Sequence, residues 1–326
     1  METRTKALLA LLLLPGPIAE IISSNTPVYK LLALGAWVAL ILIYGCGTLL
    51  IREAKVRWGL QWSVVLLAIA YGIFEEGLVT QAFFNPHWFT AGNYWMAFGV
   101  QWGWTILLLV FHASISTLIP IYMINRLWTD SENKQLLGNR GIAIVIAGTL
   151  AGIGLGMNVF AGPSGPGGFF AAPGLLIAGS AAIGVLALLA YKLRHTRIVL
   201  GRGLLPPAAI AAVAFIFQGL NTRVPPALSH FGFGVEAGVP VQLFFVLLFA
   251  LFSATQLLNR KTEGRHVVGF VFGSVFFWIV ICFLNVLFGA AARIDLVAVA
   301  PVAFVLLAAW RRRALRNGRV PKPTVA

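Results

Sequence analysis

Three ionisable residues in otherwise apolar stretches could carry chemistry. Glu75 and Glu76 are adjacent near the end of the apolar run 60–81, and His112 lies near the middle of the next run, 97–124. A carboxylate that faces an imidazole can take a proton from water or pass protons along a relay. The spacing therefore predicts a site with Glu75, Glu76 and His112 as its catalytic residues.

The composition places this site in a membrane. Of the 326 residues, 59% are hydrophobic and only 10% are charged, whereas a soluble domain carries about 25% charged residues. The net charge of +14 does not indicate nucleic acid as a partner, because the basic residues sit in short clusters between apolar runs. Such clusters are typical of loops that set membrane topology and contact anionic headgroups. We therefore expect membrane lipid as a partner and no nucleic acid.

The apolar runs predict an all-α, polytopic helix bundle. A bilayer core needs roughly 20 apolar residues per helix, and ten runs qualify: 6–22, 29–51, 60–81, 97–124, 142–160, 175–192, 204–221, 236–258, 267–288 and 295–310. If the N-terminus is inside and the runs alternate, the inside segments hold 21 of the 24 Lys and Arg residues. This positive-inside bias predicts about ten transmembrane helices with both termini in the cytoplasm. The first run also resembles a signal peptide, but Glu20 follows it and no clean cleavage site stands out, so we favour an uncleaved helix.

The domain organisation follows from these runs. Residues 1–310 form a single transmembrane domain in this interpretation, with a polar-site half at 1–128 and a Gly/Ala-rich packing half at 142–310. Residues 311–326 form a basic cytoplasmic tail, which we expect to be disordered. The expected location is the cell membrane.

Helix geometry brings the three ionisable residues toward one another. The runs 60–81 and 97–124 are antiparallel, and side chains lean toward the N-terminus of their own helix. Glu75 and Glu76 therefore lean inward while His112 leans outward, so the two sets converge in depth. Adjacent residues point about 100° apart on an α-helix, so we expect only one glutamate to aim at His112 and the other to meet a different helix.

Further polar residues could line the site. Gln101, Thr105, His112 and Ser116 share one stripe of their helix, while Tyr71 and Thr80 share the faces of the glutamates. Polar residues also recur in the outer half of later runs, which suggests a cavity that opens outward. The expected lining residues are Tyr71, Thr80, Gln101, Thr105, Ser116 and Asn158, and Gln218, Gln242 and Asn285 accompany them in the outer half.

This region resembles the CAAX-protease and bacteriocin-processing family of intramembrane proteases. The resemblance covers residues 71–116 and rests on a Glu-Glu pair followed 37 residues after Glu75 by a histidine. It implies that Glu75 activates water with help from His112, and that Glu76 is the second position of the EExxxR motif. Thr80 stands at the arginine position of that motif, Leu108 at the phenylalanine of FxxxH, and the later HxxxN motif has no counterpart.

Three functions remain open from the sequence. The leading one is a membrane-embedded hydrolase, specifically a peptidase that uses a glutamate-activated water on a membrane peptide. The second is a transporter or proton-coupled carrier with the same three residues as its ion or proton site, and the third is a structural or partner-binding protein. The residues could ligate a metal with His87, but no HExxH spacing is present, so we expect neither a metal nor another cofactor.

Some residues have simpler interpretations. The glutamates could sit at a helix end in headgroup water, with a polar rim of Gln81, Asn85 and His87. His112 could be a hydrogen-bonded packing residue. Glu20 is expected to lie at an external helix end as a cap, and the loop after Phe160, AGPSGPGG, is expected to be flexible.

Other patterns concern helix packing. Gly148, Gly152 and Gly156 repeat at four-residue spacing, which predicts a face on which another helix packs closely. Pro120 should kink its helix. Arg52 and Glu53 start a cytoplasmic loop, where we expect both to be solvated.

Overall fold

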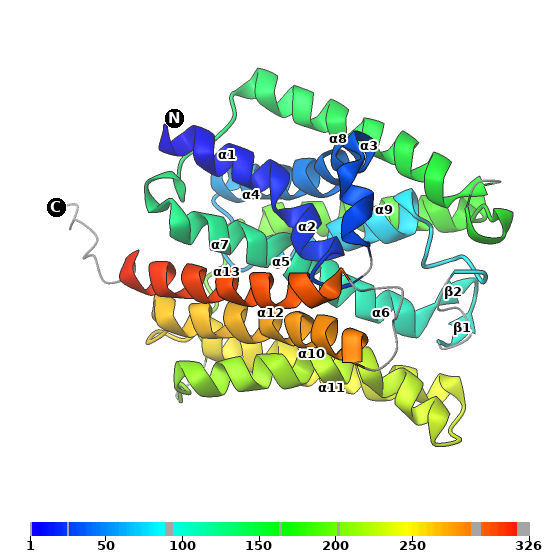
Figure 1. The fold of residues 1–326 in the computed structure, drawn as a ribbon. Coiled ribbons are helices and arrows are strands. Elements are labelled where there is room, and N and C mark those ends of the chain that lie inside the picture. Colours follow the sequence, from blue (N-terminus) through cyan, green and yellow to red (C-terminus); the bar gives the residue numbers. More distant parts are fainter. Residues whose placement is uncertain are drawn as a thin grey trace.

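The computed structural model describes residues 2–24, 26–88, 94–162, 165–200, 203–287 and 295–317. The chain is an all-α membrane protein whose helices run side by side (Figure 1). By length and composition, seven helices of the described residues can cross a membrane: Leu34–Trp58, Trp102–Leu127, Asn139–Phe160, Pro173–His195, Pro207–His230, Val235–Leu257 and Gly264–Leu287. The count of ten crossings and the cytoplasmic location of both termini stay predictions.

The first half of the chain is built from interrupted helices. It contains α1 (Thr3–Leu13), α2 (Pro15–Glu20), the 3-10 turn η1 (Val28–Leu32), α3 (Leu34–Leu40), the π-helix η2 (Ile41–Gly45) and α4 (Cys46–Trp58). These are followed by α5 (Val64–Ile73), the π-helix η3 (Phe74–Val79), α6 (Trp102–Phe111), the π-helix η5 (His112–Leu118), α7 (Ile119–Leu127) and the 3-10 turn η6 (Thr129–Ser131).

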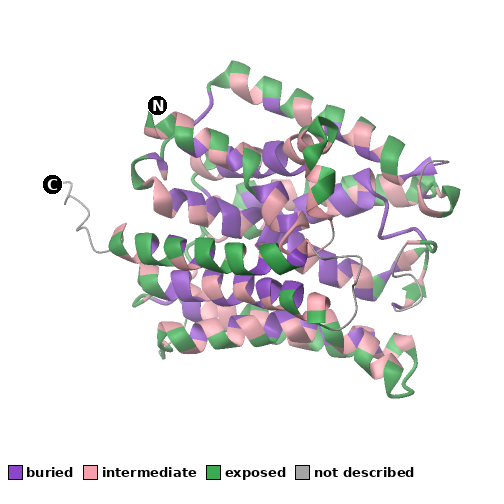
Figure 2. Cartoon of the chain, in the orientation of Figure 1, coloured by how far each residue is buried: buried purple, intermediate pink, exposed green. Residues whose placement is uncertain are grey.

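The second half consists of long, continuous helices. They are α8 (Asn139–Phe160), α9 (Pro173–Lys192), α10 (Pro207–His230), α11 (Val235–Leu257), α12 (Gly264–Leu287) and α13 (Leu296–Asn317), with the 3-10 turns η8 (Pro166–Gly168) and η9 (Leu193–His195) between them. Buried residues concentrate in the middle of the bundle, while α8 and α11 at its two edges are largely exposed (Figure 2). Exposed apolar residues on these outer helices fit a surface that faces lipid.

A small hairpin closes the end of the bundle opposite the chain termini (Figure 1). Strands β1 (Met96–Ala97) and β2 (Val100–Gln101) pair antiparallel, with Met96 opposite Gln101. The two turn residues, Phe98 and Gly99, have φ of 54° and 74°, as a tight two-residue hairpin turn requires.

The glycine repeat of α8 packs closely against the first half, as predicted. A Cβ added at Gly152 would lie 3.2 Å from the backbone carbon of Leu42, and one at Gly156 would lie 2.1 Å from Val79 Cγ1. Only glycine permits the second approach, so Gly156 sets how near α8 comes to the π-helix η3.

Pro120 lies where the π-helix η5 meets α7. It has no N–H to donate to a helix carbonyl, and just before it the Ile119 N–H donates five residues back, to the Ser114 carbonyl. In the same stretch the Thr48 hydroxyl donates to the Ser116 carbonyl oxygen at 3.1 Å, and both side chains are buried. This bond ties α4 to η5, while the kink expected at Pro120 stays a prediction.

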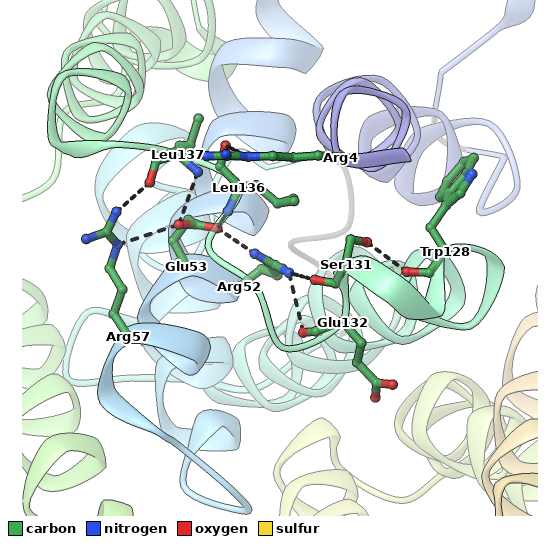
Figure 3. Close-up of polar contacts among 9 residues, drawn as sticks. All are labelled: Arg4, Arg52, Glu53, Arg57, Trp128, Ser131, Glu132, Leu136 and Leu137. Carbon is green, nitrogen blue, oxygen red and sulfur yellow. Dashed lines mark hydrogen bonds and ion pairs between the residues drawn. The ribbon is translucent and has the colours of Figure 1, made fainter. Parts of the chain in front are cut away.

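The expectation that Arg52 and Glu53 are solvated is wrong. Their side chains are 0% and 1% exposed, with Arg52 Nη1 2.6 Å from Glu53 Oε1 (Figure 3). Arg52 also donates to the carbonyls of Ser131 and Glu132, and Glu53 Oε1 accepts the Leu136 N–H at 2.9 Å. The segment after α7 folds back over these residues, so the pair fastens that segment to α4.

The same end of the bundle holds both described ends of the chain. Arg4 Nε donates to the Leu136 carbonyl at 3.1 Å, and Asn317 Nδ2 donates to the Arg126 carbonyl at 2.7 Å. Residues 311–317 continue α13 as helix, so the expectation of a disordered tail from residue 311 is wrong for this part. Residues 318–326 lie outside the described residues.

Candidate active site

Two π-helical segments carry predicted site residues: Glu75 and Glu76 lie on η3, and His112 and Ser116 lie on η5. A third π-helix, η2, carries Tyr44, which was not among the predicted residues. In η3 the Thr80 N–H donates to the Glu75 carbonyl at 2.9 Å, a five-residue step. Such π-turns hold an extra residue in the helix and are frequent at functional sites.

His112 lies between the two carboxylates. Its Nδ1 is 2.9 Å from Glu75 Oε2, and its Nε2 is 2.9 Å from Glu76 Oε1. The expectation that only one glutamate aims at His112 is therefore wrong. Adjacent residues in a π-turn diverge by less than in an α-helix, and an imidazole presents two nitrogens, so both carboxylates reach the same ring.

Short polar contacts orient Glu76 and His112. The Thr80 hydroxyl donates to Glu76 Oε2 at 2.8 Å, and Ser116 Oγ lies 3.1 Å from His112 Nδ1. Thr80 thus holds the second oxygen of the Glu76 carboxylate. Gly72 packs near His112, and a Cβ there would lie 3.2 Å from Leu109 Cδ2.

Tyr44 and Glu20, which were not among the predicted site residues, extend the site. The Tyr44 ring stacks on the His112 ring with centroids 6.2 Å apart, and the Tyr44 hydroxyl donates to Glu20 Oε1. Thr26 Oγ1 donates to the other Glu20 oxygen at 2.7 Å. Glu20 is therefore not a helix cap: it ends α2, and its carboxylate faces Tyr44. Glu20 and Tyr44 share no helix with the other site residues, so no spacing in the sequence indicated them.

Tyr71 is a predicted lining residue that does lie at the site, with its ring edge-on to His112 at a centroid distance of 6.3 Å. Gln101 is buried elsewhere, since its Nε2 donates to the carbonyls of Ala82 and Asn85 and so holds the loop after η3. Thr105 is 8% exposed, and its hydroxyl bonds no group of the described residues.

Asn158 and Gln242 of the later runs bond backbone carbonyls instead of the site. Asn158 is exposed and donates to the Gly154 carbonyl of its own helix at 2.6 Å, so its expected place in a cavity wall is wrong. Gln242 donates to the Asn221 carbonyl at 3.0 Å, linking α11 to α10.

The loops after η3 and α8 are tied together near the glutamates. Gln81 Oε1 accepts the Ala171 N–H at 2.7 Å, and Asn85 Nδ2 donates to the Pro166 carbonyl at 2.9 Å. These bonds hold the described part of the Gly/Pro-rich loop against the segment after η3. The expectation of a flexible loop is therefore wrong for residues 165–168, and Gln81 and Asn85 are buried rather than a polar rim.

The donor set could also hold a cation. Ligand atoms of Glu75, Glu76 and His112 all lie within 4.8 Å of one another, and His87 is not part of this group. One ion cannot use both ring nitrogens, so it would bind Nε2 with Glu76 or Nδ1 with Glu75. The remaining carboxylate would orient the ring, as second-shell carboxylates do for metal-bound histidines.

The buried carboxylates of Glu75 and Glu76 share one imidazole as their partner. Among the described residues, the ion pairs of Glu75 and Glu76 are formed with His112. A buried carboxylate is costly unless it is paired and hydrogen-bonded. The arrangement therefore supports a proton that moves among three groups, which is the chemistry of an acid–base catalyst or a proton relay.

Comparisons with known proteins place the chain at the level of a family. No curated protein and no solved structure matches it. A family model covers residues 8–316, nearly the whole chain and all the site residues. The chain belongs to the family that this model describes, an uncharacterized membrane protein family.

Proposed function

We propose that this membrane protein is a hydrolase, specifically a peptidase, that uses a glutamate-activated water. The observation that carries the proposal is the single imidazole held at 2.9 Å from each of two buried carboxylates. This arrangement combines a base with a group that can donate to a developing oxyanion. The resemblance of residues 71–116 to a glutamate protease family supports the same chemistry.

The two glutamates differ in their access to solvent. The Glu76 side chain is 11% exposed, whereas that of Glu75 is 3% exposed. A water or substrate therefore reaches Glu76 more readily, and we assign the base to Glu76. The resemblance gave this role to Glu75, which the geometry instead makes the group that orients His112 through Nδ1.

The reaction follows from these positions. Glu76 accepts a proton from a water that enters between its Oε1 and His112 Nε2, and the resulting hydroxide attacks the peptide carbonyl carbon. The Nε2–H then donates to the oxyanion of the tetrahedral intermediate. When the C–N bond breaks, Glu76 returns the proton to the leaving nitrogen, which yields a carboxylic acid and an amine.

The substrate class follows from the location of the site among membrane helices. We propose a membrane peptide as the substrate and the cell membrane as the location. The substrate must separate α-helical elements to reach His112, which is 2% exposed. An intramembrane segment that approaches through the bilayer meets this requirement better than a soluble chain.

The test measures cleavage in proteoliposomes. The probes are internally quenched peptides that each carry an apolar segment of about 20 residues, long enough to span the bilayer. Wild type should cleave at least one of them, and Glu76→Gln should lose turnover by 100-fold or more, in the range that general acid–base catalysis contributes. Glu75→Gln should lose less and should shift the pH profile, because it orients His112 rather than touching the water.

Glu236→Gln is the matched control. It makes the same chemical change at an exposed position in the first turn of α11, and it should retain full turnover. Equal cleavage by wild type and by the combined Glu75→Gln and Glu76→Gln variant would refute the peptidase proposal.

A proton-coupled carrier is the second candidate. The observation that favours it is the continuous polar path from Thr80 through Glu76 and His112 to Glu75, with each neighbour within 2.9 Å. A carrier should dissipate an imposed pH gradient in vesicles, read by a pH-sensitive dye, and Glu76→Gln should abolish that leak. Peptide cleavage by vesicles that show no proton flux would favour the peptidase over the carrier.

A further inference from the structure

A second site lies at the end of the bundle that holds the described chain ends. A cavity of about 530 Å³ opens there between α10, α12 and α13. None of Glu75, Glu76 or His112 lines it. Its volume falls within the range of small-molecule sites, about 300–1,000 Å³.

The walls of the cavity combine apolar surface with two arginines. Seven lining residues are apolar or glycine, among them Pro207, Ala211 and Phe272, and the other two are Arg265 and Arg311. The Arg311 guanidinium lies 5.5 Å from the centre of the Phe272 ring. The site therefore presents positive charge beside an apolar slot, which suits a molecule with an anionic head and a hydrocarbon chain.

The charge of these arginines is available to a ligand. Arg265 pairs with Glu263 at 3.0 Å, but both side chains are more than half exposed. Such an exposed ion pair contributes little to stability, so Arg265 can leave Glu263 and bind an anionic ligand. No described carboxylate forms an ion pair with Arg311, and Arg312, Arg313 and Arg316 follow on the same helix.

The depth of the cavity fits a headgroup. Arg265 stands at the first turn of α12, and Arg311 lies in the last turns of α13. The ends of apolar membrane helices lie near the headgroups, where basic residues attract anionic lipid. The apolar wall continues from there toward the bilayer core along Ala211 and Phe272.

We propose that this cavity binds one glycerophospholipid with an anionic headgroup. Its phosphate meets Arg265 and Arg311, and an acyl chain lies against Pro207, Ala211 and Phe272. The two arginines favour a negatively charged headgroup, and the apolar wall favours contact with an acyl chain. The bound lipid fills the space between α10, α12 and α13.

Native mass spectrometry of the delipidated protein tests the proposal. The probes are phosphatidylglycerol and phosphatidylcholine with the same acyl chains. Wild type should bind the first phosphatidylglycerol at least tenfold more tightly than the first phosphatidylcholine. The combined Arg265→Gln and Arg311→Gln variant should lose that tenfold preference. Ala208→Phe, which places a ring at the exposed lip of the cavity, should weaken the first binding of both lipids.

Two matched controls keep the test specific. The combined Arg312→Gln and Arg313→Gln variant removes the same charge from the same region but from residues outside the cavity, and Ala212→Phe adds the same ring one turn further along α10. Both should bind like wild type. Inorganic phosphate at millimolar concentration should not displace the lipid, because it lacks the chain. The proposal is overturned if the control variants lose as much lipid affinity as the cavity variants, or if wild type binds phosphatidylcholine as tightly as phosphatidylglycerol. It is also overturned if phosphate alone displaces the lipid.

Discussion

The contact between Gly156 and Val79 makes a quantitative prediction about how the site is positioned. Val79 belongs to the π-helix η3 that carries both glutamates, and Gly156 belongs to α8. A Cβ at Gly156 would lie 2.1 Å from Val79 Cγ1. Gly156→Ala should therefore destabilise the protein, although alanine is the better helix former.

The magnitude follows from two opposing effects. Carbon atoms in contact prefer a separation of about 3.5–4.0 Å, so α8 and η3 must part by roughly 1.5 Å, and such overpacking costs about 1–3 kcal/mol. Glycine to alanine inside a helix stabilises by up to about 1 kcal/mol. Gly154→Ala isolates this second effect, because no atom of the described residues outside its own helix turn lies within 4 Å of its added Cβ. The two variants should differ by about 1–3 kcal/mol, with Gly154→Ala the more stable.

Reversible unfolding in detergent micelles measures this difference. Adding Val79→Ala to Gly156→Ala removes the methyl group that clashes, so the pair should show a favourable coupling of about 0.5–3 kcal/mol. Activity in the peptide assay should follow the same pattern, since the clash displaces Glu76 from His112. Equal stability of Gly156→Ala and Gly154→Ala, or additive effects of Gly156→Ala and Val79→Ala, would refute the reasoning.

Two further predictions concern buried polar contacts. Arg52→Met should lower the free energy of unfolding by about 3–5 kcal/mol, because it leaves the Glu53 carboxylate without its buried partner. Adding Glu53→Gln should recover part of this loss in the same unfolding measurement. Strictly additive losses from the two substitutions would contradict this prediction. Thr48→Val should lower the free energy of unfolding by about 0.5–1.5 kcal/mol, because it removes the buried hydrogen bond from the Thr48 hydroxyl to the Ser116 carbonyl, and it should speed hydrogen exchange along η5. Thr149→Val is the control, because its hydroxyl bonds a carbonyl of its own helix; equal exchange rates in both variants would sink the idea.

Much of the architecture was predictable because hydropathy is local. Runs of about 20 apolar residues have few alternatives to a membrane helix, and each of the predicted runs contains helix in the structure. The glycine repeat likewise predicted a close helix contact, since small side chains are what permits one.

The convergence of Glu75 and Glu76 with His112 was also predictable, but its geometry was not. Depth follows from chain direction and the rise per residue, which the sequence supplies. The angle between neighbouring side chains depends on whether the backbone closes four- or five-residue hydrogen bonds. Hydropathy and spacing do not specify that choice, since a π-turn differs from an α-turn by one residue in the hydrogen-bonded step.

The sequence by itself determined that this is a helical membrane protein with two carboxylates and an imidazole at similar depth. Only the tertiary structure decided that both carboxylates hold one ring, that Tyr44 and Glu20 extend the site, and that Arg52 and Glu53 are buried. The physical reason is that apolar periodicity is a property of one helix. Burial of a polar group depends on which distant segment folds over it, and the spacing of residues along the chain does not indicate which segment that is.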